Sequence, residues 1–293
     1  MPKLLVRYGE IGLKSNSVRR RFERSLMENI ENGFLAAKSQ CRIESERGRI
    51  YVSVDDADSA TAILRKVFGI VSFSVVAEVP SDMESMKRSV VEYASPLIGD
   101  GESFAVKATR QGSHKYTSMD VAREVGGAIH DANENRGVRV DLTKPDRRIF
   151  IEVRNARAYI FASAVKGPGG LPMGSQGKVL AIIESERDNV AAWLMMRRGC
   201  KAALLAEDES PVEPLRLWDP NIRIFKSLGD SAERLAGKLK CQAIVTGGDI
   251  DHPSLLGKGE EMPLLHPLVG LSRQAISSSL KGIKSGIPPA FGA

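Results

Sequence analysis

The side chains best suited to chemistry lie in one short stretch, residues 184–189, which reads ESERDN. It holds a hydroxyl, three carboxylates, a guanidinium and an amide. The apolar run KVLAII precedes it and VAAWLMM follows it, a pattern that predicts a buried strand, a sharp turn and a helix. Helix-start N–H groups and the helix dipole favour an anion at such a junction. The stretch is therefore a candidate phosphate site.

Three of these residues are candidate nucleotide contacts, namely Ser185, Arg187 and Asp188, and Asp188 is also the candidate catalytic residue. Loops that wrap a phosphate normally contain glycine, because glycine lets backbone N–H groups converge on an anion. This loop has none. Its two glutamates would repel a pyrophosphate by about 4 kcal/mol per pair at ~4 Å and an effective dielectric constant of about 20, unless a magnesium ion bridged the charges.

A second loop, TGGDIDH at residues 246–252, follows the predicted strand CQAIV. It adds three candidate nucleotide contacts: Gly247, Gly248 and Asp249. Alternating strands and helices after residue 178 predict a parallel sheet, and such sheets bind ligands beyond the carboxyl ends of their strands. Asp249, Asp251 and His252 are residue types that hold cations. A solvated turn explains them better, so no metal site is predicted.

The elements before this domain form two mixed units. Residues 1–80 predict the order βαββαβ of a ferredoxin-like unit, with strands and helices at 3–8, 17–36, 41–54 (a hairpin), 58–67 and 69–79. Residues 82–98 then predict a helix and 104–110 a strand. A capping box of Thr117 and Asp120 starts the next helix, and two strands, RRIFIEV and RAYIFASAV, follow. The predicted apolar stripe of that helix is Val121, Val125, Ile129 and Ala132.

Charge is unevenly distributed along the chain. The net charge of +6 comes from an excess of five cations in residues 1–170 and of one in residues 171–293. A polyanion would therefore dock on the first part of the chain. The candidate RNA-binding residues are Arg19, Arg20, Arg21, Arg24, Arg110, His114, Lys115, Arg123, Lys144, Arg147 and Arg148. Tyr116 is a candidate for stacking on a base, although packing at a domain edge explains it as well.

The three cysteines, Cys41, Cys200 and Cys241, form no C-x-x-C pair, which favours reduced, packed thiols over a disulfide framework or a zinc site. No apolar run reaches the ~18 residues of a membrane span, and the start of the chain lacks the shape of a signal peptide. We therefore expect a cytoplasmic protein that has no membrane partner.

Several motifs together resemble tRNA 4-thiouridine synthetase, the tRNA sulfurtransferase family. They are RYGEIGLKS, RKVFGIVSFS, TSMDVAREVG, KGPGGLPMGSQGKVL, VAAWLMMRRGC, VTGGD and HPLVGLSR, and they occur in this order along nearly the whole chain. The resemblance implies a multidomain α/β protein. Its parts are a ferredoxin-like α+β domain at 1–78, a tRNA-binding THUMP α+β domain at 79–166, a Gly/Pro linker at 167–177 and a Rossmann-like parallel α/β domain of the PP-loop pyrophosphatase type at 178–293.

The resemblance also implies a chemistry: ATP adenylates a uridine, and a persulfide sulfur then displaces AMP. This sequence departs from the family there. The family's PP-loop is Ser-Gly-Gly-x-Asp-Ser, and counting forward from the strand retains only Asp188. Counting backward from VAAWLMM puts Arg187 in the place of the aspartate, and the sequence does not decide between the two. No cysteine follows Cys241, so the sulfur acceptor that the family implies has no counterpart.

Three functions follow from this. The first is a tRNA-binding protein that grips the acceptor region and whose ATP-pyrophosphatase loop has decayed, with no cofactor. The second is an active thiolation enzyme with a rebuilt site, in which Glu186, Asp188 and Asp249 hold Mg²⁺, Arg187 or Lys178 contacts the ATP phosphates, and a separate carrier supplies sulfur. The third is a subunit that supports an active paralogue. The family also suggests a homodimer.

Overall fold

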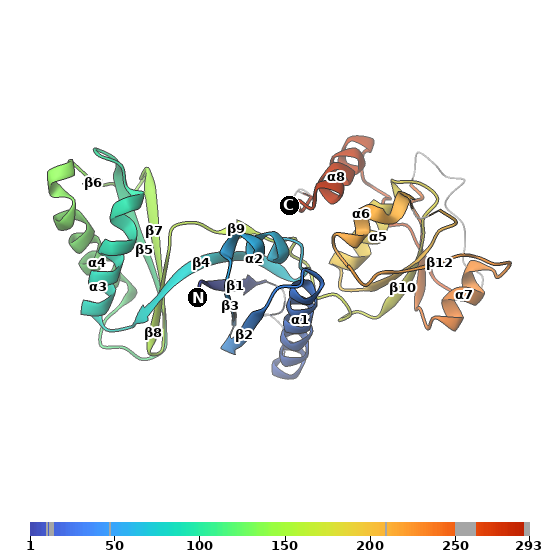
Figure 1. The fold of residues 1–293 in the computed structure, drawn as a ribbon, viewed down its shortest axis with the longest axis horizontal. Helices are drawn as coiled ribbons and strands as arrows, with labels where there is room; N and C mark the ends of the chain where they lie inside the picture. Colours follow the sequence, from blue (N-terminus) through green and yellow to red (C-terminus); the bar gives the residue numbers. More distant parts are fainter. Residues whose placement is uncertain (10, 12–14, 47, 209, 250–261, 290–293) are drawn as a thin grey trace. The chain divides into compact units, whose positions relative to one another are not determined.

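The computed structural model describes residues 1–9, 11, 15–46, 48–208, 210–249 and 262–289. The chain forms two compact units. The small unit comprises Met1–Leu5 and Ser74–Ala164, and the large unit comprises Val6–Phe73 and Val165–Ala293. Strands β1 (Lys3–Tyr8) and β4 (Ile70–Pro80) each contribute residues to both units. Figure 1 labels the elements along the chain.

The ferredoxin-like part of the large unit follows the predicted order. Strands pair as β2-β3-β1-β4, where β2 (Cys41–Glu46) and β3 (Arg49–Val54) form an antiparallel hairpin. Helix α1 (Asn16–Ala36) buries Phe22, Leu26, Ile30 and Phe34, which are spaced by four residues. Helix α2 (Ala57–Leu64) begins at Asp56, whose carboxylate accepts the N–H groups of Asp58 and Ser59. The apolar stripe of α1 therefore fixes its buried face.

The small unit is a sheet with the order β4-β8-β7-β5-β6 and two helices that pack on one face of it. Its elements are α3 (Met83–Ala94), a 3₁₀ turn (Ser95–Leu97), β5 (Ser103–Gln111), α4 (Ser118–Ala132), a 3₁₀ turn (Glu134–Arg136), β6 (Arg139–Val140), β7 (Arg147–Arg154) and β8 (Arg157–Phe161). Strands β5 and β7 run parallel, with Phe104 beside Arg147 and Gln111 beside Arg154.

Helix α4 begins with the predicted capping box of Thr117 and Asp120. Its predicted stripe is correct for Val121, Val125 and Ile129, which are buried, and wrong for Ala132, which is exposed. The next buried position belongs to Asn133 instead. Its side-chain amide donates to the carbonyl of Ile129 at 2.7 Å and to the Ser95 hydroxyl at 2.9 Å, so a satisfied polar residue ends the apolar face.

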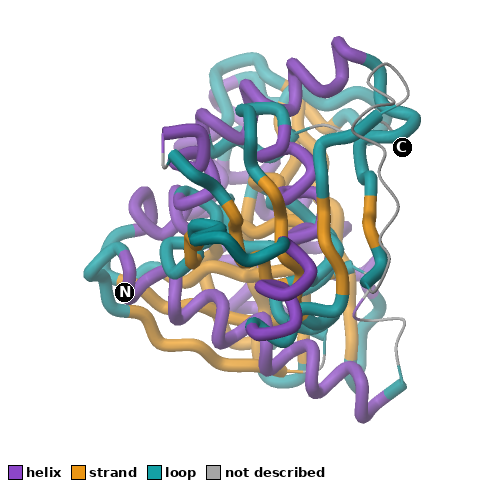
Figure 2. The backbone as a smooth tube through the Cα atoms, turned by 90° about the vertical axis from the view of Figure 1, so that its right-hand side faces the viewer, coloured by secondary structure: helices purple, strands orange, loops and turns teal. Residues whose placement is uncertain are grey.

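The C-terminal domain is a parallel sheet in the order β12-β11-β10-β13-β14. The strands are β10 (Lys178–Ile182), β11 (Lys201–Leu205), β12 (Arg223–Phe225), β13 (Ala243–Val245) and β14 (Leu264–Leu265). Helices α5 (Asp188–Arg197), α6 (Glu213–Arg216) and α8 (Arg273–Ser285) pack on one face, and α7 (Ala232–Lys238) packs on the other. Figure 2, viewed from the side of this domain, shows its strands next to one another. The predicted α/β class and the ferredoxin-like and parallel-sheet parts are confirmed.

The linker attaches the sheet domain to the ferredoxin-like part. Strand β9 (Val165–Lys166) pairs with β4, and the Gly69 N–H donates to the carbonyl of Gly169 at 2.8 Å. Gly170 has a φ of +73° and lies against the Arg197 carbonyl, so a side chain there would collide with backbone. The glycines of this linker therefore allow it to pack on α5.

Phe68 is the main apolar contact between these two parts. It is 2% exposed, and its ring centroid lies 5.3 Å from that of Trp193 and 5.6 Å from that of Trp218. Trp193 and Trp218 are themselves in edge-to-face contact at 5.2 Å. The two tryptophans form one aromatic cluster with Phe68.

Replacing Phe68 with alanine should lower the free energy of unfolding of the large unit by about 3–5 kcal/mol, because a cavity remains between two rigid rings. The chain has two tryptophans, both in contact with Phe68, so intrinsic fluorescence during urea unfolding reports on this cluster. Leu35→Ala is the control, since Leu35 is 75% exposed on α1 and should change stability by less than about 0.5 kcal/mol. Equal midpoints for the two variants would contradict the prediction.

Within the described part of the chain, no helix is long and apolar enough to cross a membrane.

Candidate functional site

The two candidate loops lie at the switch point of the C-terminal sheet. Strands β11 and β12 extend the sheet on one side of β10, whereas β13 and β14 extend it on the other. The loop after β10 and the loop after β13 are therefore neighbours at the carboxyl edge, which is where open α/β sheets bind ligands. The structure thus brings residues 184–189 together with residues 246–249, as their positions after two parallel strands predict.

Asp188 fills the anion site of its own loop. Its carboxylate oxygen Oδ2 accepts the backbone N–H of Ser185 at 2.7 Å, the backbone N–H of Glu184 at 3.0 Å and the Ser185 hydroxyl at 3.0 Å. Asp188 is 6% exposed and is the first residue of α5, where the helix dipole favours a negative charge. These are the donors that a strand–loop–helix junction would otherwise offer to a phosphate.

Gly247 allows this arrangement. A Cβ atom at position 247 would lie 1.8 Å from Asp188 Oδ1, so any side chain there would displace the carboxylate. The Gly248 N–H donates to the Thr246 hydroxyl at 3.3 Å, and that hydroxyl is 2.8 Å from His266 Nδ1. Of the predicted nucleotide contacts in this loop, Gly247 therefore contacts Asp188, and Gly248 is bonded within its own turn.

Two ion pairs join the loops to each other and to α8. Arg187 pairs with Asp249, which is 2% exposed. Lys284 of α8 donates to Glu186 Oε1 at 2.7 Å. Asn189 is buried, and its amide donates to the carbonyls of Glu186 at 3.0 Å and Pro211 at 2.6 Å. The charges of Glu186, Arg187 and Asp249 are thus satisfied within the chain.

Sequence reasoning missed Lys284 because α8 was not predicted. Signals for this helix were present: Ser272 caps its start, Gly286 ends it with a φ of +65°, and Ile276 and Ile283 are buried on one side.

The position of Lys178 differs from that of the loop residues. Lys178 begins β10 and so lies at the amino edge of the sheet, at the opposite end of the strand from the loop, so of the two alternatives for a phosphate contact only Arg187 lies at the candidate site. Asp251 and His252 lie outside the described residues.

Neither buried cysteine resembles a sulfur acceptor. Cys200 and Cys241 precede β11 and β13, at the edge opposite the two loops. Burial raises the pKa of both thiols, which disfavours the reactive thiolate. Cys200 also donates weakly to the carbonyl of Gln176 at 3.6 Å.

The candidate RNA-binding residues of the small unit form two groups. Because β5 and β7 are parallel, Lys144, Arg147 and Arg148 lie at the amino ends of these strands. The other group, Arg110, His114, Lys115 and Arg123, follows the carboxyl end of β5 and the start of α4. The structure does not bring the two groups together at one edge of the sheet.

The cations of these groups differ in their partners. Arg147 forms a two-point ion pair with Glu102 at 2.9 and 3.1 Å, which raises the pKa of Arg147 and lowers that of Glu102. Arg123 pairs with Asp120 at 3.1 Å, and Arg110 donates to the Gly112 carbonyl at 2.8 Å. Lys115, Lys144 and Arg148 are exposed and form no ion pair with any described residue.

His114 and Tyr116 have packing roles. His114 Nε2 lies 2.6 Å from the Asn155 carbonyl, and its ring stacks on Tyr116 with centroids 5.2 Å apart. The Tyr116 hydroxyl donates to the Ser81 carbonyl. Both side chains therefore hold the loop before α4 against its own unit.

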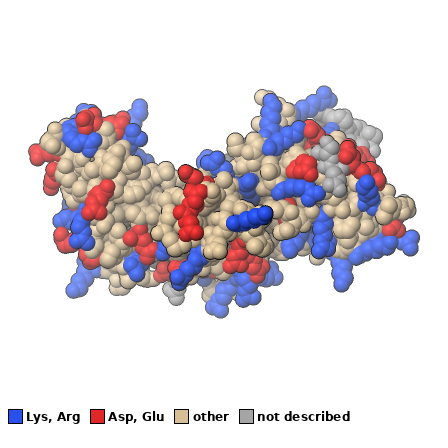
Figure 3. Space-filling model, in the orientation of Figure 1, with Lys and Arg blue, Asp and Glu red and all other residues tan. Residues whose placement is uncertain are grey.

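The four arginines of α1 lie in its first three turns. Arg19 contacts Asn16 at 2.9 Å and Glu23 at 3.9 Å, and Arg21 lies over the Phe22 ring at 5.3 Å. Arg20 and Arg24 are exposed, and neither pairs with a described residue. In Figure 3, Lys and Arg side chains gather over one end of α1, whereas the face of the small unit that is drawn carries interspersed charges of both signs.

Comparisons with known proteins agree with this architecture. The family model for the ThiI ferredoxin-like domain matches residues 3–74, and that for the THUMP domain matches residues 80–162. The crystal structure of PH1313 from Pyrococcus horikoshii superposes with a TM-score of 0.81 at 27% identity, covering 96% of this chain and 99% of that one. A 4-thiouridine synthetase solved as an RNA complex with bound ATP has the same fold, with a TM-score of 0.79 at 24% identity, covering 98% and 86%.

The fold is thus that of a THUMP-domain protein with a C-terminal parallel α/β domain. The candidate site of this domain is the loop between β10 and α5. Among curated proteins, a probable tRNA sulfurtransferase of Methanobrevibacter smithii is 33% identical over 94% of this chain and 84% of its own length. One from Saccharolobus solfataricus is 39% identical over 92% and 82%. The chain belongs to the tRNA sulfurtransferase family.

The chain is shorter than its relatives inside the matched region. The alignment with the Methanobrevibacter protein spans 328 positions, but the 94% of this chain that it covers is only about 275 residues. About 50 positions of the relative therefore lack a counterpart. A third alignment, with the protein of Methanothermobacter thermautotrophicus, spans 214 positions for 71% of this chain, about 208 residues, and so has few such positions.

Proposed function

We propose that this chain is a tRNA-binding member of its family whose C-terminal domain does not perform pyrophosphatase chemistry by itself. The ferredoxin-like and THUMP domains, at 1–78 and 79–166, would grip the acceptor region of tRNA. The domain at 178–293, joined by the linker at 167–177, would serve as a scaffold. The observation that carries this proposal is the Asp188 carboxylate, which accepts the loop N–H groups that a nucleotide phosphate would need.

Two further observations support it. A bound pyrophosphate would have to displace Asp188 from Gly247 and separate Arg187 from Asp249, so it would compete with charge pairs that are already satisfied. Breaking a buried ion pair is costly because it leaves an uncompensated charge. The chain also lacks about 50 positions that the Methanobrevibacter relative has within the aligned region.

The RNA-binding side of the proposal uses the exposed cations. Arg20 and Arg24 on α1, together with Lys115, Lys144 and Arg148 in the THUMP domain, are free to neutralise phosphates. Arg19, Arg21, Arg110, Arg123 and Arg147 would contribute only after leaving or sharing their internal partners. The 4-thiouridine synthetase with a similar fold was crystallised with RNA.

The competing function is an active thiolation enzyme, favoured by identity of 33% to a probable tRNA sulfurtransferase. In that case Arg187 would turn from Asp249 to the ATP phosphates, and Glu186, Asp188 and Asp249 would hold Mg²⁺. A separate carrier would supply the sulfur. Co-purification of a related sulfurtransferase would instead support the role of a subunit for an active paralogue.

One experiment separates these functions. The chain is mixed with tRNA, Mg²⁺ and labelled ATP, tRNA binding is confirmed by gel shift, and release of pyrophosphate is followed. We expect a salt-sensitive tRNA complex and no pyrophosphate above background. Pyrophosphate release that depends on tRNA would establish the enzyme instead, and absence of a tRNA complex would refute the proposed function altogether.

A further inference from the structure

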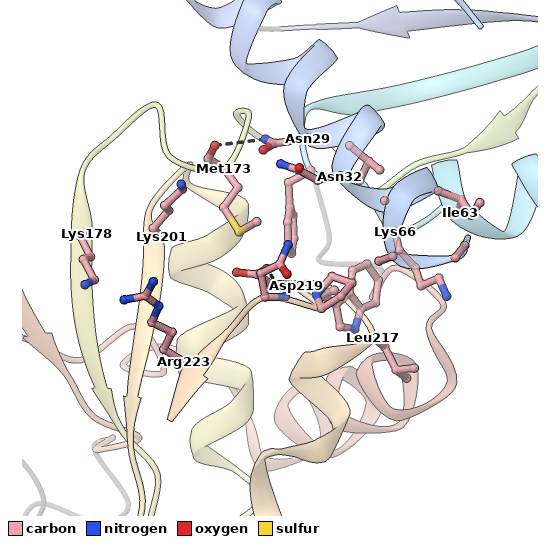
Figure 4. Close-up of a pocket in the computed structure, with 18 residues that line it drawn as sticks. Asn29, Asn32, Ile63, Lys66, Met173, Lys178, Lys201, Leu217, Asp219 and Arg223 are labelled. Carbon is pink, nitrogen blue, oxygen red and sulfur yellow. Dashed lines mark hydrogen bonds between the residues drawn. The ribbon is translucent and has the colours of Figure 1, made fainter. Parts of the chain in front are cut away.

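A cavity of about 570 Å³ lies in the large unit, at the opposite end of β10 from the two candidate loops. One side is formed by α1 and the segment after α2, and the other by the first residues of β10, β11 and β12 (Figure 4). It is therefore at the amino edge of the sheet, whereas residues 184–189 are at the carboxyl edge. The cavity is large enough for a small ligand, since such sites typically span about 300–1,000 Å³.

Cations begin three adjacent strands at this cavity. Lys178 and Lys201 are direct neighbours in the parallel pair β10–β11. Arg223 begins β12 and faces the same side of the sheet as Lys201, because its neighbour Ala203 is two residues after Lys201. Lys66 lines the cavity from the ferredoxin-like side, as Figure 4 shows. The lining thus holds four cations and one carboxylate, Asp219.

These charges are poorly balanced within the chain. Lys178 donates to the Leu239 carbonyl at 3.3 Å, a neutral partner. Burial raises the pKa of Asp219, and the charge of Lys201 opposes that rise. Lys66, Lys201 and Arg223 form no ion pair with any residue of the described chain, and Lys201 and Arg223 are exposed to solvent. Like charges at neighbouring positions repel one another, so an anion between them would be stabilised.

The rest of the lining suits the uncharged part of a small ligand that carries an anionic group. Ile63, Val67 and Leu217 form an apolar side, and Asn32 offers an amide from α1 beside them (Figure 4). The neighbouring Asn29 donates to the Met173 carbonyl at 3.1 Å, which joins α1 to the linker. A charged end next to an apolar wall with amide groups is the arrangement that orients a small polar ligand.

We propose that this cavity binds a nucleotide, with its phosphate between Lys201 and Arg223 and its base against the apolar side. Arg offers a paired donor geometry to phosphate oxygens, and Lys adds a point charge. The nucleotide could be free or could be an end of an RNA strand, and both sources share this chemistry. The site is separate from the loop at residues 184–189, and the proposal does not depend on the function proposed above.

The test uses the full chain and measures binding of AMP, inorganic phosphate and adenosine by calorimetry and by thermal shift. AMP should bind and raise the Tm, whereas adenosine should bind far more weakly. The double variant Lys201→Met and Arg223→Met should weaken AMP binding by at least about 10-fold. Lys226→Met is the matched control, because Lys226 is exposed just after the carboxyl end of β12 and should leave AMP affinity unchanged.

The outcomes are decisive in both directions. If Lys226→Met loses AMP binding and the double variant keeps it, the nucleotide binds at the carboxyl edge and the proposal is wrong. It is also wrong if AMP gives no signal or binds no better than adenosine. If the double variant unfolds, the single variants Lys201→Met and Arg223→Met replace it with the same expected direction. Displacement of AMP by a 5′-phosphorylated trinucleotide at lower concentration would assign the RNA end, and its failure to compete would assign the free nucleotide.

Discussion

Asp188→Ala should lower the free energy of unfolding of the C-terminal domain by about 2–4 kcal/mol, a large effect for one polar residue. The carboxylate accepts two backbone N–H groups and one hydroxyl. Its removal leaves these donors without a partner and removes a favourable charge from the start of α5. Urea unfolding measures the change, with Trp193, five residues after Asp188 on α5, as the fluorescent reporter.

Glu184→Ala is the matched control, because it removes a carboxylate from the same loop while Glu184 itself is exposed. It should change stability by less than about 0.5 kcal/mol. Asp188→Asn should fall between the two, since an amide oxygen still accepts hydrogen bonds without the charge. Sulfate should stabilise Asp188→Ala more than the parent chain, because the vacated N–H groups can then bind an anion. Similar midpoints for Asp188→Ala and Glu184→Ala would show that the carboxylate does not organise the loop.

The second large effect concerns RNA. Replacing Arg110, Lys115 and Arg123 together with alanine should weaken tRNA binding by about 10- to 100-fold near physiological salt and reduce the slope of log affinity against log salt by about 2. These residues surround the loop before α4, and contacts to phosphate are independent of base sequence. Binding is measured by fluorescence anisotropy at several salt concentrations and with two tRNA sequences.

A triple variant of Lys226, Arg234 and Lys281 removes the same charge from the C-terminal domain and should have a much smaller effect. The pair Lys144→Ala and Arg148→Ala tests the other end of β5 and β7 separately. Unchanged affinity in the first triple variant would mean that its residues do not form the RNA surface. An equal loss in the control would mean that net charge, and not this surface, sets the affinity.

Local patterns predicted most of the fold. The four-residue spacing of Phe22, Leu26, Ile30 and Phe34 and the capping box at Thr117 act within one helix, and the structure shows both. Helix α8 was missed although its caps are visible, because its sequence is rich in serine and weakly apolar. The separation of the cations at 144–148 from those at 110–123 was also missed. It depends on β5 and β7 being parallel, which only the tertiary structure determines.

The candidate site was predictable in its place but not in its contacts. Two loops after parallel strands share one edge of the sheet, so their common edge follows from the sequence, whereas their adjacency depends on the pairing of β10 with β13. Whether Arg187 or Asp188 faces inward depends on a single step of about 100° around the helix, and the sequence left both registers open. The contact between Arg187 and Asp249 spans 62 residues, and the packing of Gly247 on Asp188 depends on the tertiary structure.

The carboxylate in the loop also constrains how this protein could evolve. A glycine introduced at position 185 or 186 alone would leave Asp188 in contact with Gly247 and Asp249 paired with Arg187. Each single substitution toward a phosphate-binding loop would therefore bring no gain in nucleotide affinity, and a change at Asp188 would first reduce stability. A glycine-rich, phosphate-binding loop at this position would need several substitutions whose benefits appear only in combination. The substitutions are therefore epistatic, and selection would tend to retain the present loop.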